Sequence, residues 1–256
     1  MTFLMNLRQN NLNICSTFNL NGINKMPKTE YNYKRYKMSE YDLGAFPGSK
    51  AGELAENFTI CDQNGTQVSL HDYRGKWVVL ETGSITCAMY VKNIPGIKEL
   101  QVKYPDVEFL LVYVREAHPG SRLGPHESNA QKIQRAEKLK VFYDEPRKIL
   151  IDDLQGKMHK AYGELPNMVY IIDPNGRIIY RSDWAFPKRI EKILQNRDKV
   201  NTDEHVQIIT AAPWIMVPVV LRGGWDALWD ISIALPAIII AHLKADFQNL
   251  KKKLFS

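Results

Sequence analysis

Two nearly continuous apolar runs constrain the fold of this chain more than any other feature. They cover residues 77–82 and 107–114, and they are rich in Val and Leu rather than alternating with polar residues. A strand of this kind has to be covered on both faces, which is typical of central strands in a parallel sheet. Ile94, Ile97 and Leu100 lie between the runs near helical spacing, so the sequence predicts a strand–helix–strand unit.

The segment that follows carries the signature of a β-hairpin. Residues 168–173 and 177–180 are apolar, and they flank the turn tripeptide Pro174-Asn175-Gly176. A closing helix is predicted over 187–196. A parallel pair followed by an antiparallel hairpin, with helices on both faces of a central mixed sheet, is the thioredoxin arrangement. We therefore expect an α/β, thioredoxin-like domain over residues 51–199.

Two extensions flank this predicted domain. Residues 1–50 are expected to be disordered or poorly structured, and residues 200–256 to form an apolar, mainly helical C-terminal extension. The apolar runs 208–221 and 231–243 are each shorter than the roughly 20 residues that span a bilayer. We expect the extension to pack on the core or on a partner in a homodimer, with membrane-surface contact, helped by Lys251-Lys252-Lys253, as the alternative.

Charge and cysteine usage exclude several classes of protein. The chain of 256 residues has a formal net charge of +6, but residues 1–38 contain six Lys/Arg against one acid and carry +5 of it. A nucleic-acid partner is therefore not expected, because its site would need basic residues on folded structure. The three cysteines form neither a C-x-x-C motif nor a zinc spacing, so we expect no metal and a reducing, cytoplasmic location.

Cys87 is the candidate nucleophile, because it lies directly after a buried strand and directly before a helix. Free backbone N–H groups and the positive end of the helix dipole favour a thiolate there. Ser84 and Thr86 are neighbouring hydroxyls suited to donate to the sulfur or to a substrate atom. The alternative is an inert, buried thiol.

The loop Arg115-Glu116-Ala117-His118-Pro119 follows the second strand. Ligands of open α/β sheets bind beyond the carboxyl ends of the strands, so this loop and Cys87 are expected to share one crevice. We predict that His118 exchanges a proton near neutral pH, and that Glu116 orients this imidazole or binds a polar substrate group. Tyr90, Arg115, Leu165 and Pro166 are the candidate substrate-binding residues. In a thioredoxin fold the peptide bond before Pro166 is expected to be cis.

These segments together resemble the iodothyronine deiodinase family and its bacterial deiodinase-like relatives. The resemblance rests on three segments, which are residues 83–87, 111–119 and 161–172. It implies that Ser84, Thr86, Cys87, Glu116 and His118 line the site. The position of Cys87 is usually selenocysteine in deiodinases, and many of them have an accessory cysteine at the position of Ile85 and a proline at that of Ala88. The chain also resembles peroxiredoxins in fold.

The leading hypothesis is a thiol-dependent oxidoreductase with a single nucleophilic cysteine. Cys87 would attack a small-molecule electrophile (a peroxide, a disulfide or an aryl halide), and an external thiol reductant would restore it without a cofactor. Cys61 either resolves the oxidised Cys87 or is buried on an early strand. The alternative is a catalytically inactive thioredoxin-fold binding scaffold.

Overall fold

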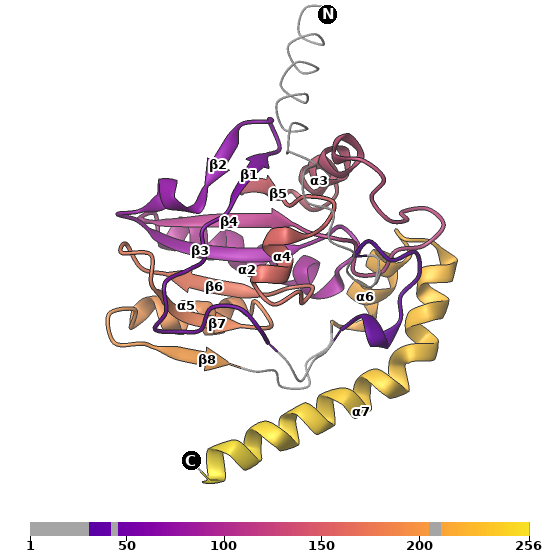
Figure 1. The fold of residues 1–256 in the computed structure, drawn as a ribbon. Helices are drawn as coiled ribbons and strands as arrows, with labels where there is room; N and C mark the ends of the chain where they lie inside the picture. Colours follow the sequence, from indigo (N-terminus) through magenta and orange to yellow (C-terminus); the bar gives the residue numbers. More distant parts are fainter. Residues whose placement is uncertain (1–30, 42–45, 205–210, 256) are drawn as a thin grey trace, which may run out of the picture.

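The computed structural model describes residues 31–41, 46–204 and 211–255, and it contains a mixed sheet of eight strands (Figure 1). The strand order across the sheet is β2-β1-β5-β4-β3-β6-β7-β8. The strands are β1 (Thr59–Asp62), β2 (Gln67–Ser69), β3 (Trp77–Gly83), β4 (Val107–Tyr113), β5 (Lys148–Ile151), β6 (Val169–Ile172), β7 (Ile178–Ser182) and β8 (Thr202–Glu204).

The centre of the sheet confirms the predicted thioredoxin-like topology. β3 pairs in parallel with β4 over seven residues, from Trp77↔Val107 to Gly83↔Tyr113, and it pairs antiparallel with β6. β6 and β7 form the predicted hairpin, in which the Gly176 amide donates to the Asp173 carbonyl at 2.8 Å. Gly176 has φ of 77°, which glycine adopts without steric cost. The order β4-β3-β6-β7 therefore reproduces a parallel pair beside an antiparallel hairpin.

Helices cover both faces of the sheet. Successive side chains of β3 point to opposite faces, and their contacts show which helices pack on each face. Val78 and Leu80 pack with residues of α4 (Lys157–Ala161) and with aromatic residues of the N-terminal segment, whereas Val79 packs on the opposite face with α2 (Ala88–Lys103) and α5 (Pro187–Gln195). Leu111 of β4 packs on that same opposite face with α3. The helices are η1 (Met38–Glu40), η2 (Leu70–Tyr73), α2 (Ala88–Lys103), α3 (Asn129–Tyr143), α4 (Lys157–Ala161), α5 (Pro187–Gln195), α6 (Pro213–Val220) and α7 (Trp225–Phe255).

The described part of the N-terminal region packs against the domain. Tyr31, Tyr33, Tyr36 and Tyr41 are all buried, although they fall within the range assigned from sequence to a poorly structured extension. Asn32 donates through its side-chain amide to the Leu154 carbonyl at 2.7 Å. Residues 1–30, which include Cys15, lie outside the described residues.

The C-terminal extension is helical, as expected, but its last helix is longer than the sequence runs indicated. α7 has 31 residues, and Pro236 lies inside it without ending it. Its segment Trp225–Lys244 is long and apolar enough to cross a membrane by length and composition, with a mean hydropathy of 1.5. The expectation of two runs too short to span was wrong, because residues 225–230 continue the same helix as the apolar residues after them.

Candidate active site

Cys87 occupies the N-cap position of α2, immediately beyond β3. The turn that leads to it is closed by the Cys87 amide, which donates to the Ser84 carbonyl at 3.1 Å. Gly83 allows the first turn of α2 to approach, because a Cβ at this position would lie 2.6 Å from the Tyr90 ring. The predicted placement of Cys87 between a buried strand and a helix is therefore present in the structure.

The Cys87 thiol is nevertheless held in its neutral form. Burial raises its pKa to about 12, and it outweighs the nearby Met89 and Tyr90 amides, which lower the pKa. Only 2% of the residue is exposed, and its side chain makes no hydrogen bond that caps the helix. The expected thiolate is thus absent from this arrangement, because desolvation disfavours the charged sulfur more than the helix start stabilises it.

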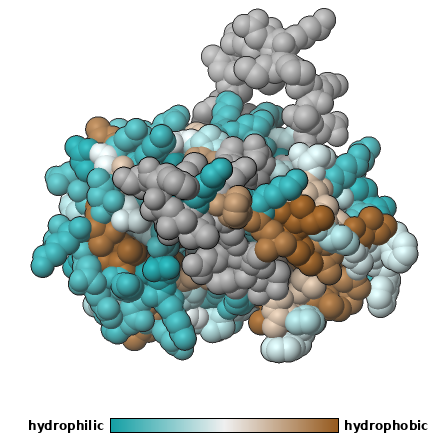
Figure 2. Space-filling view, turned by 90° about the horizontal axis from the view of Figure 1, so that it is seen from below, coloured by the Kyte–Doolittle hydropathy of each residue, from teal (hydrophilic) through white to brown (hydrophobic). Residues whose placement is uncertain are grey.

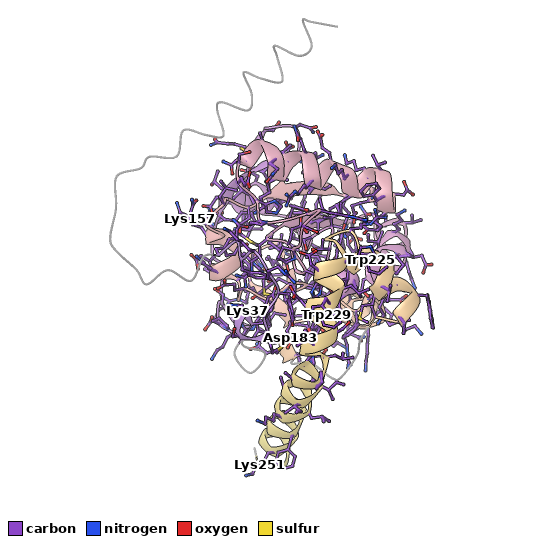
Figure 3. All side chains as sticks on the ribbon, turned by 90° about the vertical axis from the view of Figure 1, so that its right-hand side faces the viewer. Lys37, Lys157, Asp183, Trp225, Trp229 and Lys251 are labelled. Carbon is purple, nitrogen blue, oxygen red and sulfur yellow. The ribbon has the colours of Figure 1, made fainter. Side chains whose placement is uncertain are left out.

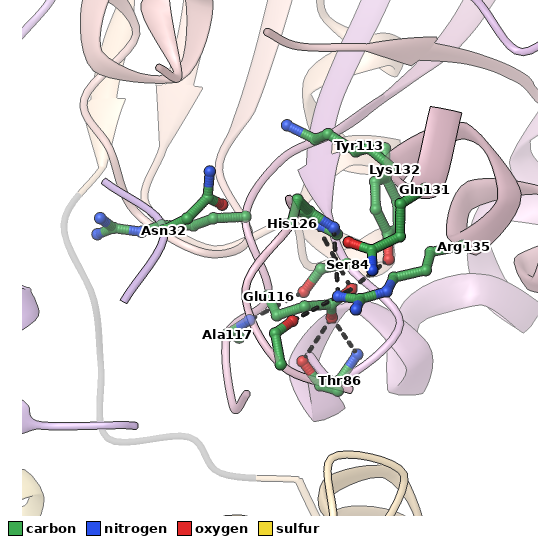
Figure 4. Close-up of polar contacts among 12 residues, drawn as sticks. Asn32, Ser84, Thr86, Tyr113, Glu116, Ala117, His126, Gln131, Lys132 and Arg135 are labelled. Atoms are coloured by element: carbon green, nitrogen blue, oxygen red, sulfur yellow. Dashed lines mark hydrogen bonds and ion pairs between the residues drawn. The ribbon is translucent and has the colours of Figure 1, made fainter. Parts of the chain in front are cut away.

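The hydroxyls of Ser84 and Thr86 join the loop after β3 to the loop after β4 (Figure 4). Ser84 Oγ accepts from the Ala117 amide at 3.1 Å. Thr86 Oγ1 accepts from the His118 amide at 3.1 Å and donates to Glu116 Oε2 at 2.7 Å. Both hydroxyls therefore position the second loop rather than point at the sulfur.

Glu116 lies in a buried polar cluster beneath these loops. Its carboxylate accepts from Tyr113 Oη at 2.5 Å and from the Thr86 amide at 3.2 Å. The imidazole beside it belongs to His126, whose Nε2 lies 3.7 Å from Glu116 Oε1, and Arg135 Nη1 lies 4.0 Å away (Figure 4). The prediction that Glu116 orients His118 through its carboxylate was wrong, because the carboxylate faces inward while the His118 amide is held by Thr86.

Cys87 and His118 line one apolar cavity of about 110 Å³. Tyr36 and Tyr41 of the N-terminal segment form one part of its wall, and Ile231, Leu235, Ile238 and His242 of α7 form another. Pro166, Trp184 and Met216 complete much of its remaining wall, and among the described residues no Asp, Glu, Lys or Arg lines it. The expected shared crevice thus exists, and the C-terminal helix forms part of its cover.

His118 is neutral at physiological pH in this arrangement. Burial lowers its pKa to about 4, although the Asp230 carboxylate acts in the opposite direction. The ring centroid lies 4.8 Å from that of Tyr36, and Nδ1 makes no hydrogen bond within the described part of the chain. The expectation that His118 titrates near neutral pH was wrong for this closed cavity, because the imidazolium would be poorly solvated there.

Two of the candidate substrate-binding residues instead hold the fold together. Tyr90 is buried, and its hydroxyl donates to Glu145 Oε2 at 2.6 Å. Arg115 forms a 2.9 Å ion pair with Glu164, and its guanidinium lies 4.9–5.1 Å from the ring centroids of Tyr31, Tyr33 and Tyr41. Arg115 therefore anchors the N-terminal segment by cation–π contacts and does not line the cavity.

Leu165 and Pro166 differ in their placement. Pro166 lines the cavity, whereas the Leu165 side chain is buried in the core and its carbonyl accepts from His159 Nε2 at 2.7 Å. The peptide bond before Pro166 is trans, since the described residues contain no cis bond, so the cis expectation was wrong. The chain turns instead at Glu164, which has a left-handed φ of 59°.

Cys87 is the free cysteine among the described residues. Cys61 is buried on β1 and disulfide-bonded. A larger hollow of about 410 Å³ includes Cys61 and Asp152 in its wall but none of the predicted catalytic residues. In this arrangement Cys61 has no thiol with which to resolve an oxidised Cys87.

Sequence reasoning missed several residues that shape the site. His126, Tyr36, Trp184 and His242 lie in segments whose sequence carries no motif, and only the folded arrangement brings them to the two loops. Within the described ranges, no group of three or more His, Cys, Asp or Glu side chains is arranged to hold a metal ion.

Comparison with known proteins gives two groups of relatives. Thyroxine 5-deiodinase from Ovis aries is 29% identical over 152 residues, which cover 54% of this chain and 51% of that protein. Thiol-disulfide oxidoreductase ResA from Bacillus thuringiensis subsp. konkukian is 26% identical over 161 residues, covering 62% of this chain and 78% of the relative. The chain thus spans about half the length of the deiodinase.

Solved structures of thiol-disulfide proteins also resemble the chain. A putative thiol:disulfide interchange protein DsbE from Chlorobium tepidum superimposes with a TM-score of 0.46 at 19% identity, covering 57% of this chain and 96% of that one. The sequence model of iodothyronine deiodinases matches residues 19–188, which is well over half of the chain. The chain therefore belongs to the iodothyronine deiodinase family.

Proposed function

We propose that this protein is a thiol-dependent oxidoreductase in which Cys87 is the single nucleophile. The observation that carries the proposal is the placement of a free thiol at the start of α2, in one cavity with His118. Membership of the iodothyronine deiodinase family supports it, as does similarity to proteins named deiodinases and thiol-disulfide oxidoreductases.

The cavity favours an apolar electrophile, because its wall is formed by aromatic, aliphatic and methionine side chains together with two histidines. An iodinated aromatic compound fits this lining better than a charged or strongly hydrated oxidant does, since entry of the latter would leave its polar groups unpaired. We therefore propose reductive dehalogenation of an aromatic compound as the main reaction, with peroxide or disulfide reduction as weaker activities of the same thiol.

The proposed reaction needs one substrate, one proton and one dithiol. Attack of the Cys87 thiolate on iodine forms an S–I bond as the C–I bond breaks, and the aryl carbon takes up a proton. An external dithiol then reduces the sulfenyl iodide, which releases iodide, restores the Cys87 thiol and converts the dithiol to a disulfide. An external reductant is required because each dehalogenation consumes two electrons, which the dithiol supplies, and Cys61, being disulfide-bonded, offers no resolving thiol.

The arrangement in which Cys87 is buried represents a resting state in this proposal. The pKa of Cys87 is raised to about 12 and that of His118 is lowered to about 4, so proton transfer from the thiol to the imidazole is unfavourable there. Access of water to the two groups lessens the desolvation and brings the two pKa values closer together. The location of the protein in the cytoplasm, its independence of cofactors and a homodimeric state stay predictions.

Intact-mass analysis with a matched variant tests the proposal. The full-length protein is incubated with an iodinated diphenyl ether, with hydrogen peroxide or with an aromatic disulfide, and turnover is then followed with dithiothreitol. We expect dehalogenation by the wild type, and neither adduct nor turnover in Cys87→Ser. Full activity in Cys87→Ser would rule out Cys87 as the nucleophile.

A redox-inactive scaffold is the second candidate, and the raised pKa of the buried Cys87 favours it. Alkylation rates measured against pH, with and without the iodinated compound, separate the two functions. An enzyme is expected to show alkylation of Cys87 that a non-reactive substrate analogue slows, because the analogue occupies the cavity that Cys87 lines. A scaffold is expected to show slow alkylation under both conditions and no turnover of any electrophile.

A further inference from the structure

α7 presents two opposite apolar faces, of which only one is used by the fold. The inner face contributes Ile231, Leu235, Ile238 and His242 to the cavity of Cys87, at helical spacings of four, three and four. At about 100° per residue, a second set of side chains lies on the far side of the helix. This set, the outer stripe, consists of Trp225, Trp229, Ile233, Ile240, Leu243 and Phe247.

The outer stripe is exposed to solvent. Its six side chains are between 52% and 68% exposed, and Trp214 on the neighbouring α6 is 78% exposed. Only 17% of the apolar window within Trp225–Lys244 is buried, so this is not the covered core helix of a globular domain. α7 projects beyond the body of the protein (Figures 1 and 3), and hydrophobic atoms gather on the side that α6 and α7 occupy (Figure 2). Such a surface requires a partner.

The width of the apolar surface favours lipid over a second copy of the chain. A two-stranded coiled coil buries a narrow seam, in which two positions of every seven are apolar. Here Ile239, which lies between the two faces, is also 43% exposed, and Leu235 of the inner face is 39% exposed. An apolar surface wider than such a seam suits the boundary between headgroups and acyl chains of a bilayer, which covers the outer stripe and Ile239 together while the inner face stays on the domain.

The residues at the two ends of α7 are those that interact with membrane interfaces. Trp225 and Trp229 lie near the body of the protein, whereas Lys251 lies at the far end (Figure 3). Lys244 and Lys251 are exposed, and Lys252 and Lys253 follow in the sequence. Tryptophan is enriched at the level of lipid headgroups, and clustered lysines attract anionic lipids.

The acidic residues of α7 nearest the body do not oppose such contact. Asp230 is paired with Arg35, whose Nε lies 2.6 Å from Asp230 Oδ2. Asp226 accepts from the Ser121 amide at 2.9 Å. Both carboxylates thus bind the first turns of α7 to the domain and leave the outer stripe apolar. We propose that the outer stripe of α7 docks the protein on the surface of a lipid bilayer that contains anionic lipid.

Vesicle flotation of the full-length protein tests this docking. We expect the wild type to float with vesicles of phosphatidylcholine and phosphatidylglycerol, and more weakly with phosphatidylcholine alone. The double variant Ile240→Glu/Leu243→Glu places two charges on the outer stripe and is expected to lose roughly tenfold or more of the bound fraction. Val141→Glu is the matched control, because Val141 is 80% exposed and belongs to α3 rather than to the outer stripe. It should float as the wild type does.

Two further measurements make the result decisive. Circular dichroism establishes that both variants remain folded, and size-exclusion chromatography without lipid reports self-association. A wild type that does not float, or a double variant that floats equally well, overturns the proposal. A wild-type dimer that dissociates in the double variant, with no flotation, identifies a second copy as the partner and also overturns it. Cys87→Ser is expected to float normally, so failure of docking is distinguishable from failure of the proposed catalysis.

Discussion

Cys87 and His118 illustrate how burial sets the chemistry of single residues at this site. Desolvation raises the pKa of the thiol and lowers that of the imidazole, so both groups are neutral in the closed cavity. A sequence places each residue on a loop, but it does not show how much water reaches either group. The position of Cys87 was therefore predictable, whereas its protonation state was not.

At the residue scale, His118 makes the fold sensitive to mild acid. Its pKa is about 4 in the folded protein against an ordinary value of 6.5, so the unfolded chain binds more protons between these values. The contribution of His118 to the free energy of unfolding is therefore fully present above pH 6.5. It is lost as the pH falls towards 4, by up to about 3 kcal/mol.

Urea unfolding of wild type and His118→Gln at several pH values measures this effect. The free energy of unfolding should fall less steeply with acid in the variant. His126 and His159 also have lowered pKa values, so the difference between the two proteins isolates His118. Parallel curves for the two proteins would contradict the assignment.

At the scale of elements, the hydroxyls of Ser84 and Thr86 join the loops after β3 and β4, and Thr86 makes two of these hydrogen bonds. Thr86 accepts from the His118 amide and donates to Glu116, which is 2% exposed. The parallel pairing of the two strands was predictable from their apolar runs, because only covered strands have that composition. The hydrogen bonds of the Thr86 hydroxyl were not predictable, because their partners depend on the final positions of both loops.

Thr86→Ala is therefore expected to destabilise the protein by about 1–3 kcal/mol, because a buried carboxylate loses a donor. Thr86→Ser, which keeps the hydroxyl, should restore most of that stability. Urea denaturation quantifies the first effect, and turnover of the iodinated substrate shows whether the displaced His118 loop slows the reaction. Equal stability of the Ala and Ser variants would show that the link contributes little.

The edges of the sheet show where sequence reasoning fails at this scale. β8 consists of Thr202–Glu204, a polar strand of three residues, and it exists because it pairs with β7. Arg115 and Tyr90 were assigned to substrate because they are polar residues near the predicted site. Their ion pair and hydrogen bond instead join segments far apart in the chain, which no local pattern reveals.

At the scale of the whole molecule, α7 and the N-terminal segment close a domain whose topology the sequence predicted well. The apolar character of residues 200–256 was evident, but their continuation through Pro236 as one helix was not. Asp226 and Asp230 fix the start of α7 on the domain through Ser121 and Arg35, contacts that the sequence pattern does not show. The covering of the candidate active site by α7 thus depends on contacts between segments far apart in the chain, which no local sequence pattern reveals.

Weakening the contacts between the inner face of α7 and the domain is expected to make Cys87 more accessible to solvent. Ile238→Ala removes contacts in the wall of the cavity, at a cost of about 1–2 kcal/mol, and should increase the open population and the rate of Cys87 alkylation roughly tenfold. Ile233→Ala is the matched control on the outer stripe and should leave the rate unchanged. Identical rates in the two variants would show that the thiol is reached by another route.

The two-sidedness of α7 has a thermodynamic consequence. The inner face of α7 lines the cavity of Cys87, and the outer stripe of the same helix faces away from the domain. A movement of α7 therefore changes both contacts at once, so that they share a single equilibrium. Linkage of this kind is reciprocal. If adsorption to lipid moves α7 and raises the affinity of the Cys87 cavity for a substrate, then a bound substrate must raise the affinity of the protein for lipid by the same factor.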